Sequence, residues 1–288
     1  LHSFAAFSGD AMPMNEVFTP GRLKEYEDWL LQRRLSWNPI SPYMRTLQAV
    51  YNRLSPPGTP EHNPRLFDDV YTKVKSQIKR ALTEEQMGRL MHADLDVLSE
   101  ELQRVQAYFL LMFLFRGMPF IDLAHLRKRD VKDGKIAYRR HKTGKQITLR
   151  IPREALPLLK EFKDRDETRL YLFPILNAAP EGDDALYECY QKALRNFNKM
   201  LRVLAKRLLP GIKISSYTAR HTWATLAYHI GMPIGIICQA LGHSSIRVTE
   251  TYLKPFENEK VDKANRKLIS TVKKHEGRSG RCFIYYKT

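Results

Sequence analysis

The most constraining feature of this sequence is its most apolar stretch, which runs from Tyr108 to Phe115. It forms the second half of a helix predicted over residues 101–116, which Gly117 and Pro119 end. A helix that is apolar nearly all round must be buried on most sides. The stretch is far shorter than the roughly 20 apolar residues that cross a bilayer. We therefore expect the end of this helix to lie in the core of a folded domain, and we do not expect a membrane protein.

A separate helical module is predicted before that core. One helix runs from Thr19, as N-cap, to about Arg34, and a second has Ser41 as N-cap and Pro42 at its first helical position. Four prolines and a glycine in residues 55–64 indicate a loop. A chain of 288 residues most naturally forms two domains. We place them at 1–80, with a basic linker at about 73–82, and at 83–288, with a separate tail at about 257–275.

The second domain is predicted to be mostly α with one small antiparallel sheet. Thr83 and Gln86 form a capping box at the start of its first helix. Two β-prone runs, 135–140 and 146–151, flank a short connection and indicate a hairpin with its tip at residues 141–145. Helices are then predicted over about 153–163 and 184–209, with further helix starts at residues 215–216, 233 and 244–245.

The charge balance narrows the class of partner. Lys and Arg outnumber Asp and Glu by 48 to 31, which gives a net charge of +17 and a pI near 9.8. Such a chain favours a polyanion, either nucleic acid or an acidic membrane surface. Cys189, Cys238 and Cys282 are odd in number and widely spaced, which favours reduced thiols in a cytoplasmic protein. We expect no metal and no cofactor.

Two matched intervals carry the functional signal. Residues 216–225 read S-Y-T-A-R-H-T-W-A-T, residues 241–243 read L-G-H, and residues 249–252 read T-E-T-Y. Arg220 precedes His243 by 23 residues, and His243 precedes Tyr252 by 9. This pattern resembles the tyrosine recombinase (phage integrase) family. The resemblance extends to Arg116 and to Lys142 on the hairpin, and it covers the second domain fully and the first only loosely.

The resemblance implies a phosphodiester-transfer site, and the residue chemistry suits it. Arg116 and Arg220 would offset the charge on the phosphate oxygens through bidentate hydrogen bonds. His243 would donate a hydrogen bond to the same phosphate. Each has a structural alternative, since Arg116 could complement a helix dipole, Arg220 could lie on a surface and His243 could be a helix cap.

The resemblance also implies a covalent mechanism that needs neither metal nor ATP. Tyr252 would attack phosphorus to form a 3′-phosphotyrosyl link, and Lys142, or alternatively Lys145, would protonate the leaving 5′-oxygen. Tyr217 stands where the family has a histidine, and a phenol accepts a proton poorly. In having a tyrosine at this position, the sequence resembles the branch of the family that is found on mobile elements and DNA-inversion switches of Bacteroidetes.

The family's architecture implies a C-shaped clamp on DNA, in which residues 1–80 bind the core site, residues 83–288 catalyse, and the tail joins subunits. The partners would be double-stranded DNA with specific sites and accessory DNA-bending proteins. The protein would be a monomer or dimer when free and would form a tetramer on paired sites. It would act in the cytoplasm of a bacterium, at the nucleoid. Candidate DNA contacts, each of which could instead be a solvated surface cation, are Arg45, Arg53, Lys73, Lys75, Lys79, Arg80, Arg139, Arg140 and Lys145, followed by Lys192, Arg195 and Lys199.

We therefore predict a site-specific DNA recombinase of the integrase or invertase type. Two alternatives stay open at this point. One is a nicking and closing enzyme like a type IB topoisomerase, which uses the same residue types without strand exchange. The other is a sequence-specific DNA-binding protein that has lost catalysis.

Overall fold

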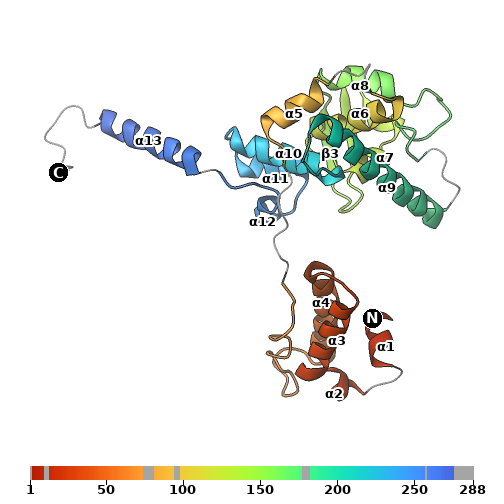
Figure 1. The fold of residues 1–288 in the computed structure, drawn as a ribbon, viewed down its shortest axis with the longest axis vertical. Helices are drawn as coiled ribbons and strands as arrows, with labels where there is room; N and C mark the ends of the chain where they lie inside the picture. Colours follow the sequence, from red (N-terminus) through yellow and green to blue (C-terminus); the bar gives the residue numbers. More distant parts are fainter. Residues whose placement is uncertain are drawn as a thin grey trace. The chain divides into compact units, whose positions relative to one another are not determined.

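The computed structural model describes residues 2–9, 13–73, 81–93, 98–176, 182–256 and 258–275 (Figure 1). For residues 272–275 it describes the backbone only. Four residues singled out from the sequence, Lys75, Lys79, Arg80 and Cys282, lie outside these ranges. The chain divides into two compact units, Leu1–Ile78 and Lys79–Thr288. The predicted fold class, mostly helical with a small antiparallel sheet, is confirmed.

The N-terminal unit is a small helical module. Its helices are α1 (His2–Ser8), α2 (Met14–Val17), α3 (Pro20–Gln32) and α4 (Trp37–Leu54). The predicted start of α3 is confirmed, because Thr19 Oγ1 accepts the Arg22 backbone N–H at 3.2 Å. Leu23 and Leu30 recur on one face of α3 and are buried against α4, as helical spacing predicts.

The predicted start of the second helix is wrong by five residues. Helix α4 begins at Trp37 and has Pro42 in its interior. Ser41 caps nothing: it is fully buried, and its hydroxyl donates to the Thr72 carbonyl at 2.9 Å. Pro42 is the sixth residue of this helix, beyond the N–H groups that have no partner inside it, so it removes a hydrogen bond that another residue would make there. Tertiary packing of Ile40 and Met44 therefore decided this boundary over the local Ser-Pro signal.

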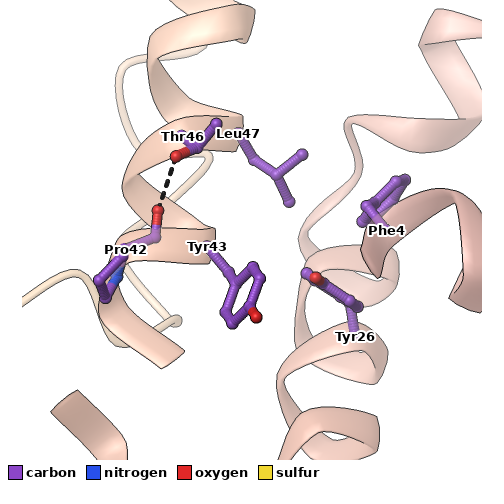
Figure 2. A pocket seen from close by; sticks show the side chains of 6 residues that line it. All are labelled: Phe4, Tyr26, Pro42, Tyr43, Thr46 and Leu47. Atoms are coloured by element: carbon purple, nitrogen blue, oxygen red, sulfur yellow. Dashed lines mark hydrogen bonds between the residues drawn. The ribbon is translucent and has the colours of Figure 1, made fainter. Parts of the chain in front are cut away.

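A shallow aromatic pocket lies between α1, α3 and α4 (Figure 2). It has a volume of about 200 Å³, and its lining includes Phe4, Tyr26 and Tyr43. The rings of Phe4 and Tyr26 meet edge to face with centroids 4.8 Å apart. Aromatic contacts thus join the aliphatic side chains in the core of the N-terminal unit.

The C-terminal unit is built around one helix. Its helices are α5 (Glu84–Met91), α6 (Glu100–Leu114), α7 (Phe120–Ala124), α8 (Ala155–Phe162), α9 (Asp183–Leu208), α10 (Ser216–His229), α11 (Ile234–Leu241), α12 (Ile246–Glu250) and α13 (Asn258–His275), with a 3-10 turn η1 (Lys128–Asp130). Helices α5, α8, α9 and α10 all pack on α6. The apolar residues of α6 around Phe109 and Leu111 are buried, as the sequence predicts.

The hairpin belongs to a three-stranded antiparallel sheet in the order β1-β2-β3. The strands are β1 (Val131–Lys132), β2 (Lys135–Arg139) and β3 (Gln146–Arg150), and β1 was not predicted. Ile136 pairs with Leu149 and Tyr138 with Ile147, and all four side chains are buried while those between them are exposed. This alternation fixes the register, because a slip by one residue would turn the apolar set outward.

Helix α13 differs from the other long helices. From Asn258 to Thr271 every side chain is exposed, including Val261, Leu268 and Ile269. Within the described ranges no helix is long and apolar enough to span a membrane. Nor do those residues contain a cluster of three or more histidine, cysteine or acidic side chains that could hold a metal.

Candidate active site

Helix α10 places Arg220 at the centre of the candidate site. The helix begins with a capping box between Ser215 and Thr218, so Arg220 lies in its second turn. The Arg220 guanidinium is 3 % exposed and donates to three neutral acceptors: the Gly117 carbonyl at 2.7 Å, the Leu241 carbonyl at 2.6 Å and His243 Nε2 at 2.9 Å. Its Nε–H is buried and has no partner among the described residues.

The turn after α6 packs directly on Arg220. A Cβ on Gly117 would lie 3.1 Å from the Arg220 Cα, and the φ of Gly117 is 69°, so both the close approach and the backbone conformation favour glycine. Arg116, the residue before it, is half-buried and adopts a left-handed conformation with φ 57°. The positive charges of Arg116, Arg140 and Arg220 all act to lower the pKa of the buried Tyr138 phenol, although burial raises it overall. Arg116 is therefore in the same electrostatic neighbourhood as Arg220.

His243 follows the end of α11. Gly242 ends the helix in the left-handed conformation with φ 67°, and the His243 N–H donates to the Cys238 carbonyl at 3.0 Å. Nε2 accepts from Arg220, so the ring proton lies on Nδ1, which donates to Thr249 Oγ1 at 3.0 Å. Burial, then the charges of Arg220 and Arg140, lower the pKa of His243 to about 4. His243 is thus neutral near pH 7.

Tyr252 is held between two imidazole rings. Its ring centroid is 4.7 Å from that of His221 and 5.0 Å from that of His243, and the Arg220 Cζ lies 5.4 Å away. The Tyr252 carbonyl accepts from Thr225 Oγ1 at 3.2 Å and from His221 Nδ1 at 3.3 Å. Arg220, His243 and Tyr252, separated by 32 residues along the chain, therefore meet in one place.

The tip of the hairpin is exposed beside this cluster. Lys142 and Lys145 are both exposed, and their charges contribute to the lowered pKa of His243. Both candidates for the general acid thus affect the same histidine electrostatically, and no side-chain hydrogen bond to another described residue distinguishes one from the other.

Arg140 is placed differently from the sequence expectation of a phosphate contact. It is only 7 % exposed, its Nε–H donates to Asp122 at 3.4 Å, and its Nη1 donates to the Leu241 carbonyl at 2.9 Å and to that of Gly242 at 3.4 Å. The inward register of β2 continues through Arg140, which explains its burial. Asp122 was missed because a single acidic residue on a short helix has no sequence pattern.

Buried positive charge exceeds buried negative charge at this site. Arg140 is paired with Asp122, whereas Arg220 donates only to neutral atoms within the described ranges. Burial and the nearby Arg140 both lower the pKa of Arg220. A buried cation with an unpaired N–H is costly unless an anion joins it. The cluster is suited to binding an oxyanion such as a phosphate.

Tyr217 lies apart from the buried cluster. It is in the first turn of α10, its side chain is 61 % exposed, and it contributes to raising the pKa of Tyr190, which burial chiefly raises to about 12.

Most predicted DNA contacts that can be described are surface cations. Arg45, Arg53, Lys73, Arg139 and Lys145 are exposed. Lys192, Arg195 and Lys199 are also exposed and begin a stripe that Arg202 and Lys206 extend along α9 with spacings of three and four residues, opposite the buried face. That spacing was readable in the sequence, but the last two residues were not singled out.

Comparisons with known proteins agree with this geometry. The model of the phage integrase family matches residues 80–259. A tyrosine recombinase of Thermosipho africanus is 23 % identical over 225 residues, covering 77 % of this chain and 74 % of that protein. The tyrosine recombinase XerA of Pyrococcus furiosus is 28 % identical over 204 residues, covering 67 % and 64 %.

Two solved structures share the fold. The integrase of transposon Tn1549 in complex with transposon right-end DNA superposes with a TM-score of 0.64 at 16 % identity, covering 93 % of this chain and 90 % of that one. The site-specific recombinase XerH bound to its difH substrate gives a TM-score of 0.56 at 16 % identity, covering 87 % and 72 %.

Proposed function

Because this chain belongs to the phage integrase family of tyrosine recombinases, we propose that it recombines DNA at specific sites, with Tyr252 as the nucleophile. The observation that carries the proposal is the buried Arg220 guanidinium, whose Nε–H has no partner in the described part of the chain and whose Cζ lies 5.4 Å from the centre of the Tyr252 ring. A scissile phosphate at this point would receive the missing hydrogen bond and would face the phenol.

The phosphate is bound by two arginines of the candidate site. Arg220 supplies the charge, and Arg116, which shares its electrostatic neighbourhood, supplies a second guanidinium. When the phosphate displaces His243 Nε2 from Arg220, its negative charge favours protonation of the imidazole. His243 then donates a hydrogen bond to a nonbridging oxygen. Thr249 keeps the other ring nitrogen engaged throughout.

The strand transfer is balanced without any cofactor. Tyr252 Oη bonds to phosphorus as its proton leaves to solvent, and the bond between phosphorus and the 5′-oxygen breaks. Lys142, with Lys145 as the alternative, gives its proton to that oxygen. The product is a 3′-phosphotyrosyl link and a free 5′-hydroxyl, and attack by another 5′-hydroxyl reverses the step on a new partner. The exposed Tyr217 leaves the family's usual proton acceptor absent, so activation rests on the positive field of Arg220.

DNA is held by the exposed cations of both units. The stripe on α9 and the surface arginines Arg45, Arg53 and Arg139 supply phosphate contacts that position the duplex without reading its sequence. The N-terminal unit is assigned to the core site, and the C-terminal unit to catalysis. Because its proposed substrate is duplex DNA, the protein is assigned to the nucleoid, where a bacterial cell holds its DNA. Membership of the Bacteroidetes branch stays a prediction that rests on Tyr217.

The exposed apolar side chains of α13 are assigned to a second copy of the chain. Val261, Leu268 and Ile269 follow one another at spacings that place them on one helix face, and they are 52 %, 63 % and 47 % exposed. In a tetramer on paired sites this face would be buried on the neighbouring subunit. Leu268→Glu should then leave binding of one site intact and abolish complexes that contain two duplexes in native gels.

The central test begins by selecting a duplex from a random-sequence pool by rounds of binding to the full chain. A nicked version of that duplex, which loses a short fragment on cleavage, should accumulate a covalent complex with wild type. Tyr252→Phe should form none, whereas Tyr228→Phe, the same chemical change at a tyrosine in α10, should react normally. If Tyr252→Phe still forms the covalent complex, the assigned nucleophile is wrong.

The same material separates the alternatives. Two differently labelled duplexes that carry the selected site should yield joined products if the protein recombines. Relaxation of supercoiled plasmid without joined products would indicate a nicking and closing enzyme. Tight binding with no covalent complex from any nicked duplex would indicate a DNA-binding protein without catalysis.

A further inference from the structure

A single carboxylate joins helix α7 to the base of the hairpin next to the candidate site. Asp122 on α7 accepts the His141 backbone N–H at 2.9 Å through one oxygen and the Arg140 Nε–H at 3.4 Å through the other. Asp122 is 3 % exposed. His141 directly precedes Lys142, so the carboxylate holds the base of the hairpin tip that carries the general acid.

Arg140 continues the connection to the histidine. Its Nη1 donates to the carbonyls of Leu241 and Gly242, which precede His243. The Leu241 carbonyl also accepts from Arg220, so both guanidinium groups meet on one oxygen. Arg140 also packs closely against Gly242, since a Cβ there would lie 2.9 Å from the Arg140 Cδ. Arg140 therefore connects the hairpin, to which it belongs, with the turn that precedes His243.

We infer that Asp122 and Arg140 are positioning residues that set the reach of Lys142 relative to His243 and the scissile phosphate. The inference rests on the proposed role of Lys142 as general acid. A hairpin with an exposed tip has few contacts of its own to hold it. The buried ion pair replaces them, and it couples the tip to the same carbonyl that orients Arg220. Arg140 thus contacts other parts of the protein, and in this hypothesis it affects the phosphate only through the residues that it positions.

A sulfur-substituted substrate separates positioning of the acid from binding of the phosphate. In the selected nicked duplex the bridging 5′-oxygen at the cleavage point is replaced by sulfur, and a thiolate leaves without protonation. Arg140→Met and Asp122→Asn should slow covalent-complex formation at least tenfold on the oxygen substrate. On the sulfur substrate the deficit should shrink to within threefold of wild type, as for Lys142→Ala. Arg220→Ala should remain slow on both.

A second readout does not involve catalysis. Trypsin cuts after lysine, and Asp122→Asn changes no tryptic site, so the rate of cutting after Lys142 in the free full chain reports on the hairpin base. We expect Asp122→Asn to accelerate this cut at least fivefold. Glu85→Gln, which removes the exposed ion pair to Arg89 and also changes no tryptic site, is the matched control and should change neither readout.

The outcomes separate the two hypotheses. An equal deficit of Arg140→Met on both substrates would show that it acts on the phosphate, and would overturn the positioning role. So would an unchanged tryptic rate together with unchanged cleavage in Asp122→Asn. If Lys142→Ala is not rescued by sulfur while Asp122→Asn loosens the hairpin and slows cleavage, the positioning role stands and Lys142 is the wrong acid. If Arg140→Met fails to fold, Asp122→Asn carries both measurements.

Discussion

Replacing Gly242 by alanine tests whether the turn before His243 is as crowded as the structure indicates. Gly242 has φ 67°, and an added Cβ would meet Ile147 Cδ1 at 2.8 Å and Arg140 Cδ at 2.9 Å. A left-handed alanine costs roughly 1–2 kcal/mol. Crowding a packed site adds about 1–3 kcal/mol, because Arg140 is anchored by Asp122 and cannot simply move away. The C-terminal unit should lose about 2–5 kcal/mol of unfolding free energy.

The matched control is Gly144→Ala at the hairpin tip. Gly144 has φ 65° and nothing within 4 Å of an added Cβ, so it incurs the backbone cost alone. Scanning calorimetry of the full chain should show a lower Tm for both variants, at roughly 2–4 °C per kcal/mol for a unit of this size. The transition of the N-terminal unit serves as an internal reference. Equal Tm losses for the two variants would refute the reasoning, since the contacts of Gly242 would then contribute nothing.

Three further predictions concern buried polar groups. Because the pKa of His243 is lowered to about 4 in the folded chain, the unfolded chain takes up a proton first as the pH falls. The contribution of neutral His243 to the unfolding free energy is therefore full above about pH 6.5 and is lost toward pH 4. The loss should reach up to about 2 kcal/mol between pH 7 and pH 5. His243→Asn should flatten this part of the Tm profile, and an unchanged slope would contradict the assignment. Thr249→Val removes the acceptor of the His243 Nδ1–H and should slow cleavage about tenfold, as a loss of roughly 1–3 kcal/mol implies, whereas the exposed Thr251→Val should not. In the N-terminal unit, Glu27→Gln weakens a buried acceptor of a backbone N–H and should lower that unit's Tm by several degrees, while the exposed Glu25→Gln should leave it unchanged.

The reactive core was predictable because its signal lies in intervals along the chain. Arg220, His243 and Tyr252 were singled out from spacings of 23 and 9 residues, and the fold brings their side chains together. Lys142 and Lys145 could not be separated by sequence, and the structure leaves both exposed at the same hairpin tip. For these residues the sequence and the structure therefore agree: both bring out the same three core residues, and both leave the two lysines unseparated.

Arg140 was not predictable in the same way. Two adjacent arginines at the end of a strand predict two surface cations, and only the alternation of β2 distinguishes the exposed Arg139 from the buried Arg140. Its partners are 18 and 101 residues away along the chain. No pattern of neighbouring residues predicts that Arg140 will bond both to Asp122 on α7 and to the Leu241 carbonyl on α11.

The sequence by itself determined what depends on neighbours within a turn or two: the caps at Thr19 and Thr83, the alternation of the hairpin strands, and the apolar helix at the centre of the second unit. Tertiary structure decided what depends on burial by distant segments. It started α4 at Trp37 in spite of the Ser-Pro pair, and it paired Arg140 with Asp122. The physical reason is that capping and periodicity are short-range, whereas the cost of burying a charge is set by whatever the completed fold places around it.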